Sequence, residues 1–333
     1  MMKDKRYISG LAFAAALLLT GACAKEADED ETAAAERRVS SWIEVHYPGI
    51  QPTEEGIYIL DETPGTGDLW DLEGKGYAYV TLTARDLEGN VTQTGDEALA
   101  RQIGSWSSTG YYGPTLWCIS LGGLPDAYNA ILTGMRIGGT RKAFLPSWTL
   151  TSGSSHTLLD LRFDYQSDNV NDYQVERLKE FSARYMAGED STWYNGTDGD
   201  RFGFYYHNLR LSDTPEEMPA DTTVYINYTG RRLDGIVFDT TLADTAKFYG
   251  IYDSSKTYAP IPVQWASAYD GITMTSSKTE PIKGFQMLLY HMRPGEKAIG
   301  AFYSELGYGS SGSGSNIPAF APLSFTVDMV EEP

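Results

Sequence analysis

Cysteine and histidine are both rare in this chain. It has two cysteines, Cys23 and Cys118, in 333 residues. The four histidines are scattered without the spacing of metal ligands, at His46, His156, His207 and His291. No nucleophile with a neighbouring base is recognisable, so we expect neither a metal nor a cofactor. If Cys23 carries a lipid, no internal disulfide can form, and the fold must be stable through its hydrophobic core.

Positive charge is also in short supply. The chain has 26 lysines and arginines against 45 aspartates and glutamates, a formal net charge of −19. Phosphate backbones are bound by clusters of basic residues, which release counterions on binding. A chain this acidic is therefore not expected to have a nucleic-acid partner.

The chain lacks an apolar run long enough to cross a bilayer as a helix. Its most apolar stretch, residues 8–19, has about 12 residues, whereas a transmembrane helix needs about 20. Basic residues precede this stretch at residues 3–6, and small residues follow it. This pattern is typical of a cleaved export signal, which we place at residues 1–22.

Cys23 follows the small residues Gly21 and Ala22, and this segment resembles a lipobox. The resemblance implies that Cys23 is the lipidated first residue of the mature chain and anchors it to a membrane. The match is imperfect because Leu19 lies one position further from the cysteine than usual. An ordinary secretory signal with an incidental cysteine remains the alternative.

The segment after Cys23 is strongly charged. Residues 23–31 contain five acidic side chains and no large apolar one, so they cannot bury apolar surface and should stay disordered. This segment resembles the acidic signals that send some Bacteroidetes lipoproteins to the cell surface. We therefore expect a bacterial outer-membrane lipoprotein of the cell envelope that faces the periplasm or the cell surface, and the sequence does not indicate its oligomeric state.

The rest of the chain repeats itself. Each half begins with an amphipathic helix, continues with a short strand and ends in alternating apolar residues, at 159–165 and at 323–329. The hairpin signal Leu-Glu-Gly at 87–89 corresponds to Leu-Asp-Gly at 233–235. A period of two places alternate side chains on one buried face. The repeat therefore predicts an α+β fold of two antiparallel half-barrel sheets, each wrapped around a short helix.

The second half carries seven short motifs in a fixed order. They are Val-Tyr-Ile-Asn-Tyr-Thr-Gly (224–230), Leu-Asp-Gly-Ile-Val-Phe-Asp (233–239), Pro-Ile-Lys-Gly-Phe (281–285), Met-Arg-Pro-Gly-Glu-Lys (292–297), Leu-Gly-Tyr-Gly (306–309), Asn-Ile-Pro-Ala (316–319) and Leu-Ser-Phe-Thr-Val (323–327). In order and spacing, residues 221–330 closely resemble the FKBP family of peptidyl-prolyl cis-trans isomerases. The resemblance implies an enzyme that acts on X-Pro bonds and has proline-containing polypeptides as its partners.

With this resemblance the chain divides into successive regions. They are a signal peptide (1–22), an acidic tether (23–36), a degenerate FKBP-like domain with a leading helix (37–166), a linker with a helix and a strand (167–220), and an FKBP-type isomerase domain (221–333) that carries an insertion (250–280).

The family's site residues carry over position by position. The resemblance implies an apolar proline pocket formed by Tyr228, Phe238, Phe248, Phe285, Ile317 and Phe325. It also implies that the backbone amide of Ile282 and the hydroxyl of Tyr308 hold the substrate carbonyl, while Asp239 forms the polar edge. The chain departs from the family at Phe285, where Trp is usual, at Asp244, where Arg is common, and in the insertion, which the resemblance places beside the pocket.

Isomerisation also has a physical rationale in such a pocket. Amide resonance keeps the X-Pro bond planar behind a barrier of roughly 18 to 20 kcal/mol, and uncatalysed exchange takes tens of seconds or more. Water stabilises the planar, charge-separated amide more than the twisted one. An apolar pocket with oriented donors therefore favours the transition state without any covalent step.

The first half keeps the pattern but not the site. The equivalents of Tyr228, Phe238, Asp239 and Phe285 are Leu82, Thr92, Gln93 and Tyr128. The carboxylate and one aromatic wall are missing. We therefore predict that the first copy folds in the same way without isomerase activity.

Two other functions remain open on the sequence alone. The chain could be a chaperone or peptide-binding lipoprotein without turnover, using aromatic residues in or next to the insertion: Tyr249, Tyr252, Tyr258, Trp265 and Tyr269. It could also be a structural lipoprotein of the envelope. A hydrophobic core alone would explain the aromatic residues, but it would not explain a carboxylate at Asp239 among them.

Overall fold

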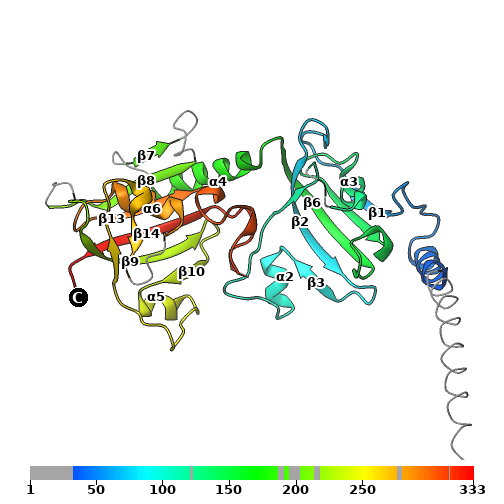
Figure 1. Ribbon diagram of the computed structural model, residues 1–333. Helices are drawn as coiled ribbons and strands as arrows, with labels where there is room; N and C mark the ends of the chain where they lie inside the picture. Colours follow the sequence, from blue (N-terminus) through cyan, green and yellow to red (C-terminus); the bar gives the residue numbers. More distant parts are fainter. Residues whose placement is uncertain are drawn as a thin grey trace, which may run out of the picture.

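The protein consists of two sheet domains that lie side by side, joined by a long helix (Figure 1). The computed structural model describes residues 33–120, 122, 124–186, 191–194, 203–213, 218–275, 280–314 and 316–333. The predicted signal peptide, Cys23 and most of the acidic tether lie outside the described residues. None of the described helices is both long and apolar enough to span a bilayer.

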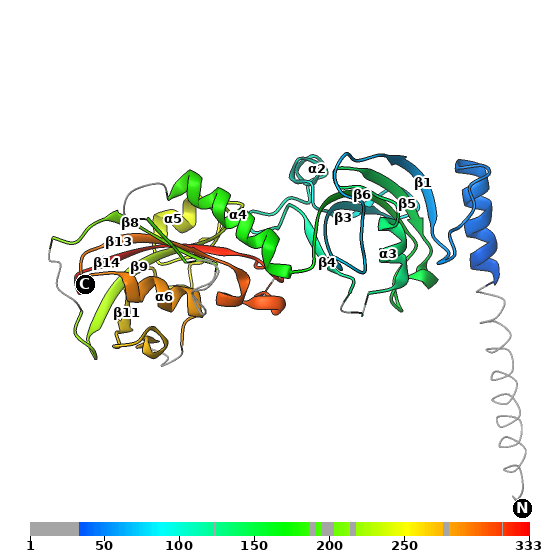
Figure 2. The ribbon, with the colours of Figure 1, turned by 90° about the horizontal axis from the view of Figure 1, so that it is seen from above.

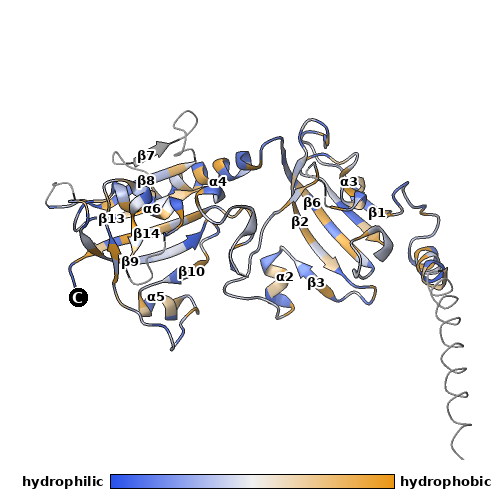
Figure 3. Ribbon diagram, in the orientation of Figure 1, coloured by the Kyte–Doolittle hydropathy of each residue, from blue (hydrophilic) through white to orange (hydrophobic). Residues whose placement is uncertain are grey.

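The first domain is a six-stranded antiparallel sheet in the order β1-β5-β6-β2-β3, with β4 also paired to β2. Its elements are β1 (Tyr58–Thr63), β2 (Tyr77–Arg85), β3 (Val91–Thr94), α2 (Glu97–Gln102), β4 (Thr115–Cys118), α3 (Asp126–Leu132), β5 (Thr140–Leu145) and β6 (Thr157–Ser167). Hydrophobic and hydrophilic residues alternate along β2 and β6 (Figure 3). The hydrophobic side chains on one face of the sheet pack against α3, whose Ile131 and Leu132 are fully buried.

A helix over residues 33–46 covers the other face of the first sheet. It lies at the outer end of the molecule, away from the second domain (Figure 2). Val39 and Ile43 are buried against Phe144 and Leu158, as expected for one apolar stripe on an amphipathic helix. Residues 33–36, which the sequence analysis assigned to the tether, are already part of this helix.

The second domain is an eight-stranded antiparallel sheet in the order β12-β11-β9-β14-β13-β8-β7, with β10 also paired to β9. Its elements are β7 (Ser191–Tyr194), β8 (Phe204–Arg210), β9 (Thr223–Arg232), β10 (Val237–Thr240), α5 (Ala243–Phe248), β11 (Ile261–Gln264), β12 (Thr273–Met274), α6 (Lys283–His291), β13 (Lys297–Phe302) and β14 (Leu323–Val330). Helix α6 lies across this sheet (Figure 2). The expectation of two antiparallel sheets, each packed on a short helix, is confirmed.

Two glycines allow α6 to approach the sheet closely. A Cβ atom added at Gly284 would lie 2.4 Å from the ring of Phe302, and one added at Gly300 would lie 3.1 Å from Leu288. A Cβ atom at residue 284 would require Phe302 to move, and one at residue 300 would press on Leu288, so the short helix and the sheet form one tightly packed core.

The helix and the strand within the segment predicted as a linker, residues 167–220, belong to the folded core instead. Strand β8 pairs with β13 in the second sheet. Helix α4 (Val170–Tyr185) buries Leu178 in the second core, and its Gln174 accepts a hydrogen bond from the amide of Ser304 at 2.7 Å. The ring of Tyr173 stacks on Tyr79 of the first domain at 3.9 Å. Helix α4 therefore packs against both domains.

The insertion, residues 250–280, is also partly structural. Strand β11 pairs with β9 and β12 pairs with β11, so the insertion adds two strands to the edge of the sheet. Trp265 is only 4% exposed and joins the core together with Val263 and Ile272. Trp265 is thus not available for holding a client chain, which corrects that part of the chaperone hypothesis.

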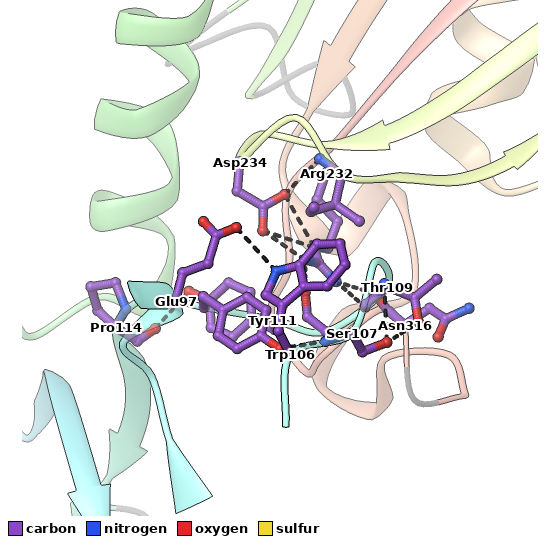
Figure 4. A network of polar contacts seen from close by, with 12 residues as sticks. Glu97, Trp106, Ser107, Thr109, Tyr111, Pro114, Arg232, Asp234 and Asn316 are labelled. Carbon is purple, nitrogen blue, oxygen red and sulfur yellow. Dashed lines mark hydrogen bonds and ion pairs between the residues drawn. The ribbon is translucent and has the colours of Figure 1, made fainter. Parts of the chain in front are cut away.

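The two domains meet at the guanidinium of Arg232, which is 2% exposed (Figure 4). It donates hydrogen bonds to the carbonyls of Thr109 (3.0 Å) and Gly110 (2.5 Å) in the first domain and of Asn316 (2.6 Å) in the second. An ion pair of 2.7 Å with Asp234 balances its charge. Because a buried charge is tolerated only when it is paired and fully hydrogen-bonded, this contact fixes the domains against each other.

Candidate functional site

Four aromatic rings gather where β9, β10, β14 and α6 meet. The ring centroids of Phe285 and Phe325 are 4.9 Å apart, those of Tyr228 and Phe285 are 5.6 Å apart, and those of Phe238 and Phe325 are 5.6 Å apart. All three pairs are edge-to-face, the arrangement that aromatic quadrupoles prefer. Phe285 and Phe325 are buried, whereas Tyr228 and Phe238 are half-buried and present apolar surface to solvent. We refer to these four residues as the aromatic cluster.

Gly230 makes room for the aromatic cluster. It pairs with Phe325 across β9 and β14. A Cβ atom at residue 230 would lie 2.8 Å from the rings of both Phe238 and Phe325. The glycine that ends the motif at 224–230 is therefore required by the two rings that cover it.

A bulge in β10 lets two consecutive residues reach the site. The register with β9 shifts between Val237 and Asp239, so Phe238 has no partner in the ladder. Neighbouring residues of a regular strand would point to opposite faces, and a bulge changes this direction. As a result, the ring of Phe238 packs on Phe325 while the carboxylate of Asp239 accepts a hydrogen bond from the hydroxyl of Tyr228.

Asp239 has three donors around its carboxylate. Besides Tyr228, the amide of Thr240 donates to Oδ1 at 2.9 Å, and the ammonium group of Lys256 forms an ion pair with the same oxygen. Lys256 comes from the insertion. This contact is not predictable from the sequence, because no motif or spacing rule connects residue 256 to residue 239.

The two tyrosine hydroxyls of the site stay protonated. Burial, followed by the negative charge of Asp239, raises the pKa of Tyr228 well above its usual range. Burial, followed by the negative charge of Asp239, also raises the pKa of Tyr308. Both side chains are therefore neutral hydrogen-bond donors at physiological pH. Tyr308 is 37% exposed, and no described residue pairs with its hydroxyl.

Ile282 provides a second free donor. It is the N-cap of α6, and its carbonyl accepts hydrogen bonds from the amides of Phe285 and Gln286 at 2.9 and 3.1 Å. Its own amide precedes the helix and donates to no acceptor among the described residues. The side chain of Ile282 packs against the core that contains Phe285.

The loop after Tyr308 brings Ile317 into the same core. Ser313 and Ile317 exchange backbone hydrogen bonds at 2.8 and 3.2 Å. Gly312 has φ +63°, and a Cβ atom there would lie 2.3 Å from the carbonyl oxygen of Ile317. A glycine is therefore needed for the loop to close, and Ile317 is buried in the core of the second domain.

Phe248 is not part of the aromatic cluster. It is 82% exposed, and its ring packs on Tyr249. Ala246 is the buried residue of the short helix α5. Because each helical residue turns by about 100°, Phe248 points away from the face that Ala246 buries. The resemblance thus placed Phe248 in the pocket wrongly.

The first domain lacks the equivalent arrangement. Its Thr92 and Gln93, at the positions of Phe238 and Asp239, are exposed. Trp117 from β4 packs edge-on against Tyr128 at 4.7 Å and is buried in the first core. No carboxylate faces an aromatic cluster at these positions.

The second domain therefore defines a class of site. Apolar rings surround a Tyr–Asp pair, two donors are free, and none of the described residues forms a group of three or more metal-ligating side chains. Such a site can bind an apolar ring next to a carbonyl group.

The sequence model described as "FKBP-type peptidyl-prolyl cis-trans isomerase" matches residues 214–330, so this part of the chain is an FKBP-type peptidyl-prolyl cis-trans isomerase domain.

Two curated proteins are similar to this region. The macrophage infectivity potentiator of Trypanosoma cruzi is 29% identical over 128 residues, which are 38% of this chain and 52% of that protein. Peptidyl-prolyl cis-trans isomerase FKBP2 of Bos taurus is 26% identical over 136 residues, which are 41% of this chain and 80% of that protein. The chain thus spans about half the length of the first relative and four fifths of the second.

Three solved structures are among those to which this chain is similar. A peptidyl-prolyl cis-trans isomerase of Pseudomonas syringae is 22% identical, with a TM-score of 0.31, and covers 50% of this chain and 97% of that one. The three FKBP domains of wheat FKBP73 are 15% identical, with a TM-score of 0.30 and coverage of 84% and 95%. FkpA of Escherichia coli is 22% identical, with a TM-score of 0.31 and coverage of 47% and 57%.

Proposed function

We propose that the second domain isomerises X-Pro bonds in exported polypeptides, through desolvation and hydrogen bonding and without a covalent intermediate. The observation that supports this best is the aromatic cluster around the Tyr228–Asp239 pair, with the free donors of Ile282 and Tyr308 beside it. The family match at residues 214–330 supports the reaction class.

The first part of the mechanism is desolvation. The prolyl ring binds against Phe238 and Phe285, where the described surroundings are apolar. Removing water from the imide destabilises its planar, charge-separated form relative to the twisted form. A thousandfold acceleration requires only about 4 kcal/mol, which is within reach of such a non-covalent effect.

The second part is stabilisation of the carbonyl groups of the substrate. The Ile282 amide and the Tyr308 hydroxyl can donate to carbonyl oxygens as the bond twists. Asp239 orients the site because it fixes the hydroxyl of Tyr228 on one oxygen and Lys256 on the other. These groups act through fixed charge and direction, so no proton transfer is needed.

The test is a prolyl isomerisation assay on the full chain. Phe238→Ala combined with Asp239→Ala removes a wall and the polar edge, and we expect kcat/KM to fall by at least about tenfold. The matched control is Thr92→Ala combined with Gln93→Ala, at the equivalent exposed positions of the first domain, which should retain full activity. Equal rates for wild type and the site variant would refute the proposal.

A non-catalytic peptide-binding function is the second candidate. It is favoured by the exposed rings of Phe248 and Tyr252, which lie at the end of α5 and at the start of the insertion. If this candidate were correct, prevention of client aggregation would survive Phe238→Ala with Asp239→Ala and would be lost on Phe248→Ala with Tyr252→Ala.

We also propose that Cys23 anchors the chain to the outer membrane as a lipoprotein. The support is the sequence pattern alone, because Cys23 lies outside the described residues. Metabolic labelling with palmitate in a bacterial host tests this directly. Cys23→Ala should lose the label and release the protein from the membrane fraction, whereas Cys118→Ala should not.

A further inference from the structure

A cavity lies between the two domains, away from the aromatic cluster. It has a volume of about 960 Å³ and is lined by the first-domain segment 111–116, by α4 and by the second-domain segments 231–235 and 318–322. Arg231 and Ser324 line it and are paired across β9 and β14, one position from the pair Gly230 and Phe325. Because side chains alternate between faces, the cavity and the aromatic cluster lie on opposite faces of the sheet.

The cavity is positively charged in an acidic protein. Four arginines line it together with Glu180 and Asp234. Both acids are already paired, Glu180 with Arg177 at 2.6 Å and Asp234 with Arg232 at 2.7 Å.

The other two arginines, Arg184 and Arg231, have no carboxylate partner among the described residues. Their guanidinium groups lie over the rings of Tyr185 and Tyr249, at 5.1 and 5.7 Å from the ring centroids. In a chain of net charge −19, two arginines left without acids favour an anionic ligand.

The remaining lining is aromatic and proline-rich. Tyr79, Tyr111 and Tyr173 come from one side, and Pro318, Phe320 and Pro322 come from the other. Aromatic grooves of this kind suit extended peptides, whose side chains lie between the rings while the backbone stays accessible. The size and the mixed lining therefore fit a stretch of polypeptide better than a small inorganic anion.

Phe320 connects the cavity to the loop that follows Tyr308. Its φ is +58°, a left-handed conformation that a residue with a Cβ rarely adopts and that concentrates at functional positions. Its amide donates to the carbonyl of Gly309 at 2.9 Å, directly after Tyr308. This hydrogen bond connects Phe320, which lines the cavity, to the residue that follows Tyr308 of the candidate site.

We propose that this interdomain cavity binds an acidic, aromatic- or proline-containing segment of the client polypeptide. Carboxylates of the segment pair with Arg184 and Arg231, and its apolar side chains pack on Tyr111 and Phe320. The identity of the ligand as a client rests on the proposed isomerase function, whereas binding in the cavity does not. The degenerate first domain would then supply one wall of a second binding site.

The experiment measures binding of two labelled peptides to the full chain by fluorescence anisotropy. One peptide alternates Glu with Tyr and Pro, and the other replaces every Glu with Gln. The acidic peptide should bind at least about tenfold more tightly and should weaken as salt increases. Equal affinity for the two peptides would overturn the proposal.

Variants locate the site. Arg184→Gln combined with Arg231→Gln should weaken binding of the acidic peptide by about tenfold or more. Arg184→Gln alone, at an exposed position, should show a smaller loss in the same direction and serves if the double variant does not fold. The control, Lys75→Gln combined with Lys179→Gln, removes the same charge outside the cavity and should bind normally. Unchanged binding in both arginine variants would overturn the proposal.

A last pair of measurements separates the two proposals. Isomerisation of a short uncharged prolyl peptide should be normal in Arg184→Gln. Binding of the acidic peptide should be normal in Phe238→Ala with Asp239→Ala. Loss of binding in that variant would overturn the proposal that the cavity is a site separate from the aromatic cluster. If wild type bound the acidic peptide through Arg184 but isomerised nothing, the proposed function would fail while the cavity site would stand.

Discussion

At the scale of single residues, the site is organised by the hydroxyl of Tyr228 and the carboxylate of Asp239. Both residues follow from family motifs in the sequence, because each lies in a continuous stretch with recognisable neighbours. The ion pair from Lys256 does not, because a lysine in an insertion carries no signal of what it contacts across 17 residues. Its position depends on how the chain turns back after α5.

Tyr228 should make stability depend on alkaline pH. Its pKa is raised in the folded state by burial and by Asp239, above the value of about 10 expected when unfolded. The unfolded chain therefore loses this proton first as pH rises. The contribution of Tyr228 to stability is complete below pH 10 and falls above it, by up to about 1.4 kcal/mol per pH unit.

The measurement is the free energy of unfolding of wild type and Tyr228→Phe between pH 8 and 11. The phenylalanine variant keeps the ring but has no proton to lose, so the two curves should converge as pH rises. Parallel curves across this range would show that Tyr228 ionises equally in both states.

Lys256 should influence which clients the site prefers. Lys256→Gln removes one positive charge next to Asp239 without removing the carboxylate. Peptides with an acidic residue beside proline should then lose activity relative to peptides with a basic residue, by roughly two- to fivefold in kcat/KM. The ratio of kcat/KM for the two peptides is the measurement. The exposed Lys179→Gln variant should leave the ratio unchanged.

At the scale of elements, the order of helices and strands was predictable from the sequence, but the partners with which the strands pair were not. The period of two in β2, β6, β9 and β14 and the glycine-containing turns identify the sheets. Strand β8 was expected in a linker, but it pairs with β13 in the second sheet. Strand pairing joins residues about 90 positions apart, and local periodicity does not specify such partners.

The orientation of α5 gives a prediction that differs from the one the family pattern would give for Phe248. Phe248 ends this helix and is exposed. Phe248→Ala should therefore change kcat/KM for a short prolyl peptide by less than about twofold, because the residue contacts solvent rather than the bound ring. Phe285→Ala, within the aromatic cluster, should reduce kcat/KM by tenfold or more. A large loss for Phe248→Ala would place this ring in the pocket.

At the scale of the whole molecule, the two domains are coupled through Arg232. Its guanidinium joins Thr109 and Gly110 of the first domain to Asn316, next to Ile317, which we predict to line the pocket. The first domain is thus packed against the loop of the FKBP-type domain that carries Asn316. We expect this contact to hold the loop in place.

Arg232→Gln should uncouple the domains. The shorter, neutral side chain cannot reach the three carbonyls and leaves Asp234 without its partner, so we expect a loss of about 2 to 4 kcal/mol in the free energy of unfolding. Calorimetry should then resolve two transitions where wild type shows one. Arg210→Gln, which breaks an exposed ion pair with Asp328, should leave a single transition.

The sequence by itself determined the two antiparallel sheets, the fold class and most of the aromatic cluster. These features depend on local periodicity and on short motifs, in which each residue lies close to its neighbours along the chain. Only the tertiary structure decided that Lys256 pairs with Asp239, that Phe248 faces solvent, that residues 203–210 complete the second sheet and that Arg232 joins the domains. These contacts form between segments distant in sequence, where chain direction and burial select the partners.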